Sequence, residues 1–191
     1  VNLWDQMEKR PAARAMLKSL LDYAGSDAFA PTQALTEADL RTFLTDNPDS
    51  ASARGAKVLY VDSEEPGENP AANAIDGDES TIWHTEYQAR QPGYPHEIAL
   101  DYGTSRDIVG FRYLPRQSQP NGRFTQYAFY AGDDPKVWGE PLASGAFPND
   151  TTEQVVMLKS PVRARYIRLV GLRGANNRAW MSVAELDIVT P

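Results

Sequence analysis

The chain of 191 residues is long enough for one full domain with its own hydrophobic core and a smaller appendage, and too short for two large domains. Its formal net charge of -7 argues against nucleic acid and anionic membranes as partners, because both call for a basic protein surface. The sequence contains no cysteine, so any metal ion would have to be held by oxygen atoms or histidine.

The N-terminal segment VNLWDQMEKR has no long apolar core of the kind found in signal peptides. Nowhere does the sequence approach the roughly 18 apolar residues that a membrane-spanning helix needs. We therefore expect a soluble protein without membrane insertion, and one that belongs to a longer chain.

Residues 1–46 are predicted to form a helical segment. In the first predicted helix, apolar residues recur at spacings of three and four over residues 16–24, which places them on one face. Pro11 suits the first turn of this helix and Gly25 suits its end. A second, shorter helix is predicted to begin at Thr36, where the sequence resembles a capping box.

Residues 47–55 carry turn formers and small polar residues without a periodic apolar face, which predicts a connector. From residue 56 onwards, apolar and polar residues alternate, as they do in strands that bury one face. Eight strands are predicted, separated by clusters of Gly, Pro, Asn and Asp: Lys57–Val61, Glu97–Tyr102, Ile108–Leu114, Phe124–Ala131, Leu142–Gly145, Gln154–Leu158, Ala164–Leu172 and Ser182–Val189.

These predicted strands follow one another without an intervening helix. That order argues against doubly wound folds, in which strands alternate with helices, and favours two stacked antiparallel sheets. We therefore predict an all-β domain over residues 56–191, an eight-stranded jelly-roll β-sandwich preceded by a short α-helical segment.

Hard oxygen donors are concentrated in the loop Asp76-Gly77-Asp78 and at Thr81, which follows it. Calcium prefers about six to eight oxygen ligands, and an isolated Asp-Gly pair can also be a simple tight turn. The metal interpretation gains support from Glu185, which begins an otherwise apolar terminal strand. Burial of this carboxylate would be costly without a cation or another partner.

Aromatic and polar side chains of the kind that bind sugars follow the acidic loop. An aromatic ring covers the C–H face of a pyranose, while Arg, Asn and neutral His form hydrogen bonds with its hydroxyls. Residues of these types are Trp83, His84, Tyr87, Arg116, Gln117, Asn121 and Trp180.

Several of these residues also have a purely structural explanation. Trp83 occupies a strand-like position and is expected in the core, whereas Trp180, in a loop, suits either role. A lone histidine such as His84 is often structural, and we interpret His96, next to a strand start, as structural. Asn121 precedes a glycine and also suits a turn.

Six segments carry a resemblance to a known family. AIDGDESTIWHT, PHEIALDYG, IVGFRYLPRQ, NGRFTQYAFY, ARYIRLVGL and WMSVAELDIV, in this order, resemble the factor V/VIII type C, or discoidin-like, superfamily. More closely, residues 53–190 are similar to a family 32 carbohydrate-binding module. The resemblance implies a galactose-binding-domain-like jelly roll, a structural calcium ion and a shallow sugar site formed by loops at one end.

The resemblance also implies a role for individual residues. The implied calcium ligands come from Asp76, Asp78 and Thr81, together with the backbone oxygens of Asn73 and Ala184 and the carboxylate of Glu185. The implied galactose-binding residues are His84, Arg116 and Asn121, with Trp180 as the aromatic platform. Glu68 and Tyr87 are expected at the periphery of this site, and Gln117 is expected to influence the choice of sugar.

The function implied by the resemblance is non-catalytic binding of terminal galactose or N-acetylgalactosamine, which directs an attached glycan-degrading enzyme to its substrate. The expected partners are a glycan and the catalytic domain of a parent glycoside hydrolase, and the expected location is secreted, cell-surface or periplasmic. The N-terminal segment RPAARAMLKSLLDYAGSDAF looks similar to segments near the catalytic domains of large multidomain glycoside hydrolases.

Two other functions stay open at this point. A discoidin-type adhesion domain that binds protein or lipid would need exposed apolar loop tips, whereas the loops here carry Gln, Asn and Arg. A glycosidase needs only two suitably placed carboxylates, and Asp and Glu are plentiful. The sequence has no GxSxG motif, no His-rich metal motif and no phosphate-binding glycine loop, so we expect no catalytic residue.

Overall fold

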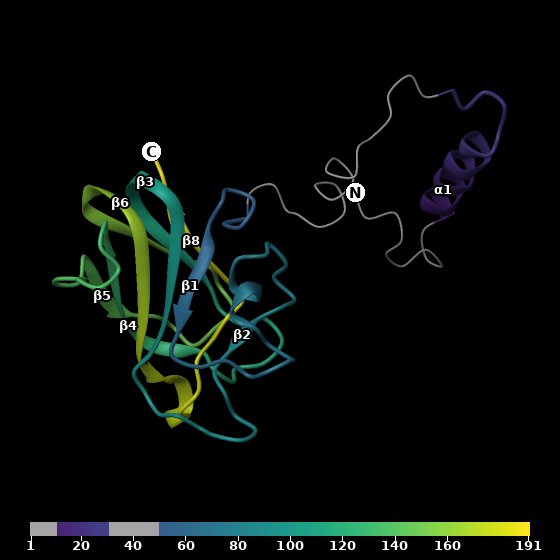
Figure 1. Ribbon diagram of the computed structural model, residues 1–191. Helices are drawn as coiled ribbons and strands as arrows, with labels where there is room; N and C mark the ends of the chain where they lie inside the picture. Colours follow the sequence, from purple (N-terminus) through teal and green to yellow (C-terminus); the bar gives the residue numbers. More distant parts are fainter. Residues whose placement is uncertain (1–10, 31–49) are drawn as a thin grey trace. The chain divides into compact units, whose positions relative to one another are not determined.

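A computed structural model of the chain describes residues 11–30 and 50–191 (Figure 1). The protein divides into two compact units, Val1–Arg41 and Thr42–Pro191.

The first unit contains helix α1, Pro11–Ala24. The helix begins at the proline and ends where the amide of Gly25 donates a hydrogen bond to the carbonyl oxygen of Leu21 at 3.0 Å, as the sequence predicted. The second predicted helix, beginning at Thr36, lies outside the described residues. None of the helices in the described part of the chain is long and apolar enough to cross a membrane.

The second unit consists of antiparallel strands and short 3-10 turns. Its elements in chain order are β1 (Lys57–Val61), η2 (Ala71–Ala74), β2 (Trp83–His84), β3 (His96–Leu114), β4 (Phe124–Gly132), β5 (Ala143–Ala146), β6 (Gln154–Gly174), η3 (Ala175–Asn177), β7 (Ser182–Val183) and β8 (Glu185–Val189). The main sheet has the order β1-β3-β6-β4-β5, with β8 paired to β3, and β2 pairs with β7 in a small second sheet.

The long strands β3 and β6 explain how one hydrogen-bonded sheet forms both layers of a sandwich. The first half of β3 pairs with β1 and its second half pairs with β8. Its pairing with β6 shifts register between Asp101 and Arg106 and again between Ile108 and Gly110. Such irregularities bend a strand, and β3 curves accordingly in Figure 1.

The all-β, antiparallel prediction is confirmed, while the strand boundaries differ from those predicted. The predicted strands Glu97–Tyr102 and Ile108–Leu114 are two halves of β3, and the strands predicted at 154–158 and 164–172 both belong to β6. Each strand is continuous in the structure, and β3 and β6 pair on both sides of the irregular stretches between Asp101 and Arg106 and between Ile108 and Gly110.

The last predicted strand, Ser182–Val189, is divided at Ala184. Its first part is β7, which pairs with β2, and its second part is β8, which pairs with β3. The sequence analysis did not predict β2, because two residues are too few to show an alternating pattern.

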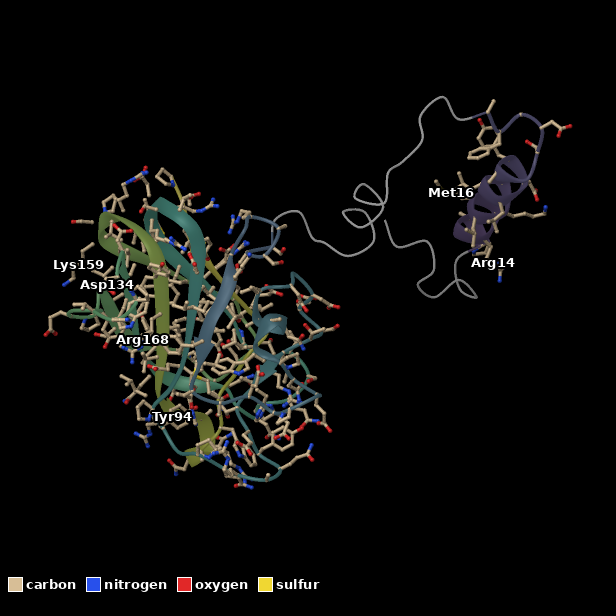
Figure 2. The ribbon with its side chains drawn as sticks, in the orientation of Figure 1. Arg14, Met16, Tyr94, Asp134, Lys159 and Arg168 are labelled. Carbon is tan, nitrogen blue, oxygen red and sulfur yellow. The ribbon has the colours of Figure 1, made fainter. Side chains whose placement is uncertain are left out.

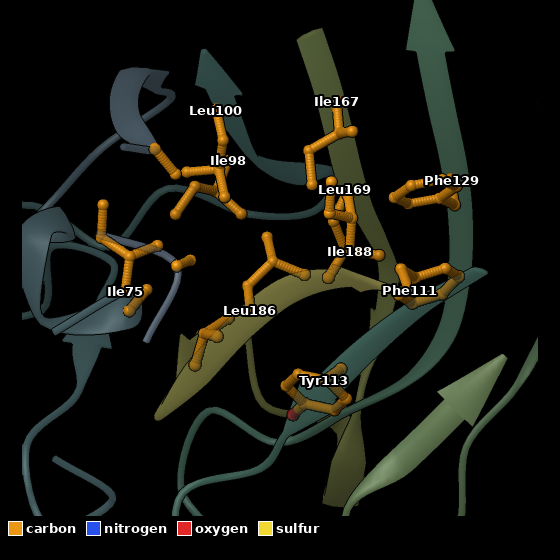
Figure 3. Close-up of a cluster of buried hydrophobic side chains, with 14 of the residues drawn as sticks. Ile75, Ile98, Leu100, Phe111, Tyr113, Phe129, Ile167, Leu169, Leu186 and Ile188 are labelled. Atoms are coloured by element: carbon orange, nitrogen blue, oxygen red, sulfur yellow. The ribbon is translucent and has the colours of Figure 1, made fainter. Parts of the chain in front are cut away.

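The core lies between the two layers of the sandwich (Figure 3). Phe111 and Phe129 stack there with ring centroids 4.2 Å apart. Other fully or almost fully buried members are Ile98, Leu100, Tyr113, Ile167, Leu169, Leu186 and Ile188. Each such side chain contributes about 1.5–3 kcal/mol to the stability of the fold. The loops at the ends of the strands are therefore carried by a tightly packed base.

Residues 50–55, which the sequence analysis assigned to the connector, pack against the sandwich. Ser50 and Ala51 are almost fully buried, and Arg54 forms an ion pair with Asp187 of β8. The folded sandwich therefore begins within the segment predicted as a connector; the rest of that segment lies outside the described residues.

Candidate functional site

The small sheet of β2 and β7 positions Trp83 and His84, which point to opposite sides. Trp83 is fully buried and its Nε1 donates a hydrogen bond to the carbonyl oxygen of Ser63 at 3.0 Å, in agreement with its predicted core position. Successive strand residues point to opposite sides, so His84 faces away from Trp83. His84 is paired with Ser182 of β7.

His84 lines a pocket of about 190 Å³. The residues around this pocket are Asn69, His84, Tyr87, Arg116, Asn121 and Trp180. The sequence analysis selected each of them except Asn69. The structure thus brings together side chains from segments that are far apart in the chain.

The ring of His84 presents a hydrogen-bond acceptor to this pocket. Its Nδ1 lies 2.6 Å from the carbonyl oxygen of Thr85, which can only accept, so Nδ1 carries the proton and Nε2 of the neutral ring is left as an acceptor. Burial lowers the pKa of His84, the bond to Thr85 opposes this shift, and the charge of Arg116 lowers the pKa further. The neutral ring is therefore favoured near neutral pH.

Arg116 supplies the complementary donors. Its Nε donates to the hydroxyl of Ser118 at 3.2 Å, and its terminal nitrogens have no protein acceptor among residues 11–30 and 50–191. The backbone of Arg116 is held by Arg123, whose Nε and Nη2 donate to the Arg116 carbonyl oxygen at 3.1 and 2.8 Å. Arg123 is only 9% exposed, so it acts as a buried support for the loop that carries Arg116.

Asn121 lies on a turn that is joined to β7. The amide of Ser182 donates to the carbonyl oxygen of Gly122 at 2.7 Å, and the Ser182 hydroxyl donates to the carbonyl oxygen of Asn121 at 3.0 Å. Gly122 has a φ of 82°, and a Cβ there would lie 2.5 Å from the Ser182 hydroxyl oxygen. Only glycine therefore suits this position, and the contact fixes the backbone of Asn121.

Two aromatic rings flank the imidazole of His84. The centroid of Tyr87 lies 4.9 Å away in an edge-on arrangement, and that of Trp180 lies 6.1 Å away at a tilt of 52°. The guanidinium of Arg178 lies 5.4 Å from the Trp180 centroid. These rings give the polar pocket an apolar wall.

Two residues expected around the sugar, Glu68 and Gln117, do not line the pocket. Glu68 lies outside the pocket lining, where its carboxylate accepts the hydroxyl hydrogen of Tyr87 at 2.6 Å and so orients that ring. Gln117, which was expected to influence the choice of sugar, has its side-chain amide bonded to backbone oxygens. Its Nε2 donates to the carbonyl oxygens of Pro115 and Thr151 at 2.6 and 3.0 Å, so that it joins two loops instead.

Sequence reasoning missed Asn69, which lines the pocket, and Glu65, which holds the backbone of Tyr87. Asn69 reaches it because its carbonyl oxygen accepts the amide hydrogen of His84 at 3.2 Å, which places this segment beside β2. Glu65 is 3% exposed, and one carboxylate oxygen accepts the amide hydrogens of Tyr87 and Gln88 at 2.7 and 3.0 Å. Glu65 lies in an irregular segment between β1 and η2. No periodic pattern there could have predicted that this charged residue is buried.

The acidic loop is joined to the start of β8. The amide of Gly77 donates to Glu185 Oε1 at 2.8 Å, and the hydroxyl of Thr81 donates to Asp76 Oδ2 at 2.8 Å. Asp78 Oδ1 accepts hydrogen bonds from the amide and hydroxyl of Ser80 at 2.9 and 2.6 Å, which closes the loop locally.

The carboxylates of Glu185 and Asp76 lie close together at this loop. Burial raises the pKa of Glu185 to about 8, and the charge of Asp76 and a hydrogen bond with it add to this shift. The Gly77 amide and the charge of Arg112 oppose the shift. No group of three or more His, Cys, Asp and Glu side chains in the described ranges is placed to hold a metal ion. A cation here would need carbonyl and hydroxyl oxygens beside the two carboxylates, and hard ions such as Ca²⁺ accept such mixed oxygen sets.

The comparison with family models decides to which family the chain belongs. Residues 59–186 match the model of the F5/8 type C domain. The chain belongs to the F5/8 type C domain family. Residues 1–45, which precede this domain, match a domain of unknown function, DUF8487.

Curated relatives of this F5/8 type C domain protein are considerably longer. A sialidase of Micromonospora viridifaciens is 42% identical over 135 residues, which cover 69% of this chain and 21% of the relative. A galactose oxidase of Gibberella zeae is 36% identical over 141 residues, covering 73% of this chain and 20% of the relative. The chain thus spans about a fifth of the length of these relatives.

Solved structures similar to this F5/8 type C domain include family 32 carbohydrate-binding modules of Clostridium perfringens. One, in complex with GalNAc-β-1,3-galactose, is 31% identical with a TM-score of 0.66, over 72% of this chain and 97% of that one. Another, in complex with galactose, is 28% identical with a TM-score of 0.64, over 72% of this chain and 95% of that one. The predicted resemblance to this family of modules is confirmed.

Proposed function

We propose that this F5/8 type C domain is a non-catalytic carbohydrate-binding module that takes a terminal galactose-type sugar, galactose or N-acetylgalactosamine, in the His84 pocket. The observation that carries the proposal is the acceptor at His84 Nε2 beside the donors of Arg116 in one pocket. One sugar hydroxyl can donate to the imidazole and accept from the guanidinium at the same time. The complexes of similar modules with galactose and GalNAc-β-1,3-galactose support this choice of sugar.

The remaining groups of the pocket fit a single sugar unit. Trp180 and Tyr87 offer ring surface to the C–H groups of a pyranose, and the amides of Asn69 and Asn121 suit neighbouring hydroxyls. The pocket volume of about 190 Å³ lies below the range of roughly 300–1,000 Å³ that is usual for larger ligands. This size favours the end of a glycan chain over an extended stretch of it.

The proposed biological role is to hold an attached glycan-degrading enzyme near its substrate. Support comes from the curated relatives, which include a sialidase five times as long as the matched region. A shallow site binds one sugar weakly, and linkage to a catalytic domain or to further modules raises the effective concentration at the glycan. A target glycan outside the cell would place the protein in a secreted, cell-surface or periplasmic location.

We further propose a structural Ca²⁺ ion at the acidic loop. The residues that would hold it are Asp76, Asp78, Thr81, Glu185 and the backbone oxygens of Asn73 and Ala184. The support is the contact of the Asp76 and Glu185 carboxylates. A cation between them would neutralise the negative charge that is otherwise removed by protonation of Glu185. The ion would fasten the loop to β8.

A glycan array tests the proposed sugar specificity. The wild-type protein is expected to bind glycans that end in galactose or N-acetylgalactosamine. Arg116→Ala is expected to lose about 10- to 100-fold in affinity, because a hydrogen bond to a charged group contributes about 1.5–3 kcal/mol. Arg163→Ala is the matched control, since the side chain of Arg163 is 66% exposed and lies in an ion pair on β6. Absence of binding to every glycan, or equal binding by Arg116→Ala, would contradict the proposal.

A further inference from the structure

His96, the first residue of β3, is fully buried and has an acceptor at each ring nitrogen. Nδ1 lies 2.7 Å from Oδ2 of Asp62, and Nε2 lies 2.5 Å from the carbonyl oxygen of Ala179. The other oxygen of Asp62 accepts the amide hydrogen of Glu97 at 2.7 Å. A carboxylate and a carbonyl oxygen only accept hydrogen bonds, so both nitrogens of His96 must carry a proton and the ring must be an imidazolium.

The surroundings of His96 favour this charged form. The groups that face the ring are the carboxylate of Asp62, the edge-on ring of Tyr94 at 4.7 Å, and the carbonyl oxygens of Ala179 and Pro92. Burial by itself lowers the pKa of His96, but the hydrogen bonds and the charge of Asp62 outweigh it and raise the pKa above its ordinary value.

The bond to Ala179 links His96 to the sugar pocket. Ala179 directly precedes Trp180, and the hydroxyl of Tyr94 donates to the carbonyl oxygen of Trp180 at 2.6 Å. Two consecutive carbonyl oxygens of this loop are thus bonded to His96, the first residue of β3, and to Tyr94, which precedes the strand. Figure 2 shows Tyr94 at the end of the sandwich where β6 finishes. The two bonds hold the backbone that carries the Trp180 ring, whose centroid lies 6.1 Å from that of His84.

We propose that His96 is a positioning residue of the sugar pocket: its imidazolium, anchored by Asp62, holds the Ala179 carbonyl and thereby keeps the Trp180 ring in place beside His84. The effect on sugar affinity rests on the proposed function. The protonation of His96 and the position of Trp180 do not depend on that function.

When His96 loses one of its two ring protons, its hydrogen bond to Ala179 is lost. The charge of Asp62 retains the proton at Nδ1, so Nε2 becomes an acceptor facing the carbonyl oxygen of Ala179, and the two repel each other. Tyr94 keeps its own bond, because burial raises its pKa and it stays protonated over the same pH range. The charge of His96 also disfavours protonation of His84, so its loss removes one of the influences that keep His84 neutral.

An NMR titration tests the protonation and the link to Trp180 without any sugar. In the wild-type protein, the nitrogen resonances of His96 are expected to show two protonated ring nitrogens at neutral pH. The indole resonance of Trp180 is expected to shift at alkaline pH with the same midpoint as His96. Asp62→Asn is expected to move both midpoints to lower pH. Asp107→Asn, the matched change in an exposed ion pair, is expected to move neither.

A singly protonated His96 ring at neutral pH would overturn the proposal, and so would a Trp180 resonance that does not follow the His96 titration. Both outcomes are independent of sugar binding, so a protein that binds no sugar at all would contradict only the proposed function.

Galactose titrations over the same pH range test the consequence for affinity. Affinity is expected to fall about two- to tenfold as His96 loses its proton, the loss usual for one hydrogen bond. The fall is expected at lower pH in Asp62→Asn and at unchanged pH in Asp107→Asn. If the wild-type protein binds galactose and the two variants have identical alkaline profiles, His96 does not position the site.

Discussion

His84 can accept a hydrogen bond from a sugar only while its ring is neutral. Its pKa in the folded protein lies below the ordinary value of 6.5, so folding favours the neutral ring. Its contribution to stability is complete above the unfolded pKa and decreases as the pH falls towards the folded one. Sugar affinity is expected to follow the same course and to be lost on acidification, because a protonated Nε2 is a second donor beside Arg116.

Calorimetric titration of galactose between weakly acidic and neutral pH measures this dependence. His84→Gln, which places an amide oxygen near the acceptor position, is expected to bind more weakly but without the acidic decrease. Affinity that rises on acidification of the wild-type protein would be inconsistent with an acceptor role.

Individual site residues were predictable to different degrees. The resemblance and the chemistry of sugars pointed to His84 and Arg116, and the pocket contains both. Gln117, which was expected to influence the choice of sugar, does not line the pocket, because its Nε2 is bonded to the carbonyl oxygens of Pro115 and Thr151. Asn69 was missed because it reaches the pocket through a backbone hydrogen bond with His84, a pairing that no local pattern encodes.

At the scale of elements, the turn before β4 fixes part of the pocket. Gly122→Ala would add strain at a positive φ and a clash with Ser182 of β7. We expect a loss of about 2–4 kcal/mol in unfolding free energy and weaker galactose binding, because Asn121 moves with the turn. Gly139→Ala is the matched control: its φ is also positive, at 64°, but nothing lies within 4 Å of an added Cβ.

Urea unfolding and galactose titration of the two glycine variants separate strain from the clash. Gly139→Ala is expected to lose only about 1–2 kcal/mol and to bind galactose normally. Equal effects of the two substitutions on affinity would show that the Gly122 turn does not position Asn121.

The acidic loop gives a second prediction at this scale. Without a cation, the pKa of Glu185 at about 8 lies above its unfolded value, so its contribution to stability is complete at acidic pH and is lost as the pH rises towards 8. Calcium in about 100-fold excess over its Kd is expected to add about 2.7 kcal/mol and to raise the melting temperature by roughly 5–10 °C.

Thermal melts with calcium or with a chelator at mildly alkaline pH measure this effect. Glu185→Gln is expected to lose the response to calcium, and without calcium to melt above the wild-type protein. Glu140→Gln, an exposed change on another loop, is expected to retain the wild-type response. Melting temperatures that are insensitive to the chelator would leave the Asp76 loop as a simple turn.

Alternation in the sequence predicted which residues of the strands face the core, as Ile98 and Leu100 illustrate. It did not predict that β3 and β6 each run through both layers, because the bends occur at irregular pairings within polar stretches. The strand β2 was not predicted because it is only two residues long, although its pairing with β7 places His84 opposite Ser182.

At the scale of the whole molecule, the sandwich separates the proposed sugar pocket from the outer face of its main sheet. Trp180 lines the pocket, whereas Trp138 packs against Arg168 of β6, whose guanidinium lies 5.8 Å from the Trp138 centroid. Trp83 is buried in the core. The indole resonances of Trp180, Trp138 and Trp83 therefore report on three different regions of the sandwich.

The most direct test of the sugar-binding proposal is a galactose titration followed by the indole N–H resonances. We expect the Trp180 resonance to shift in a saturable manner, while that of Trp138 stays unchanged, and we expect Arg116→Ala to abolish the shift at the same galactose concentrations. A Trp180 resonance that does not respond to galactose or N-acetylgalactosamine, or one that responds equally in Arg116→Ala, would contradict sugar binding in this pocket.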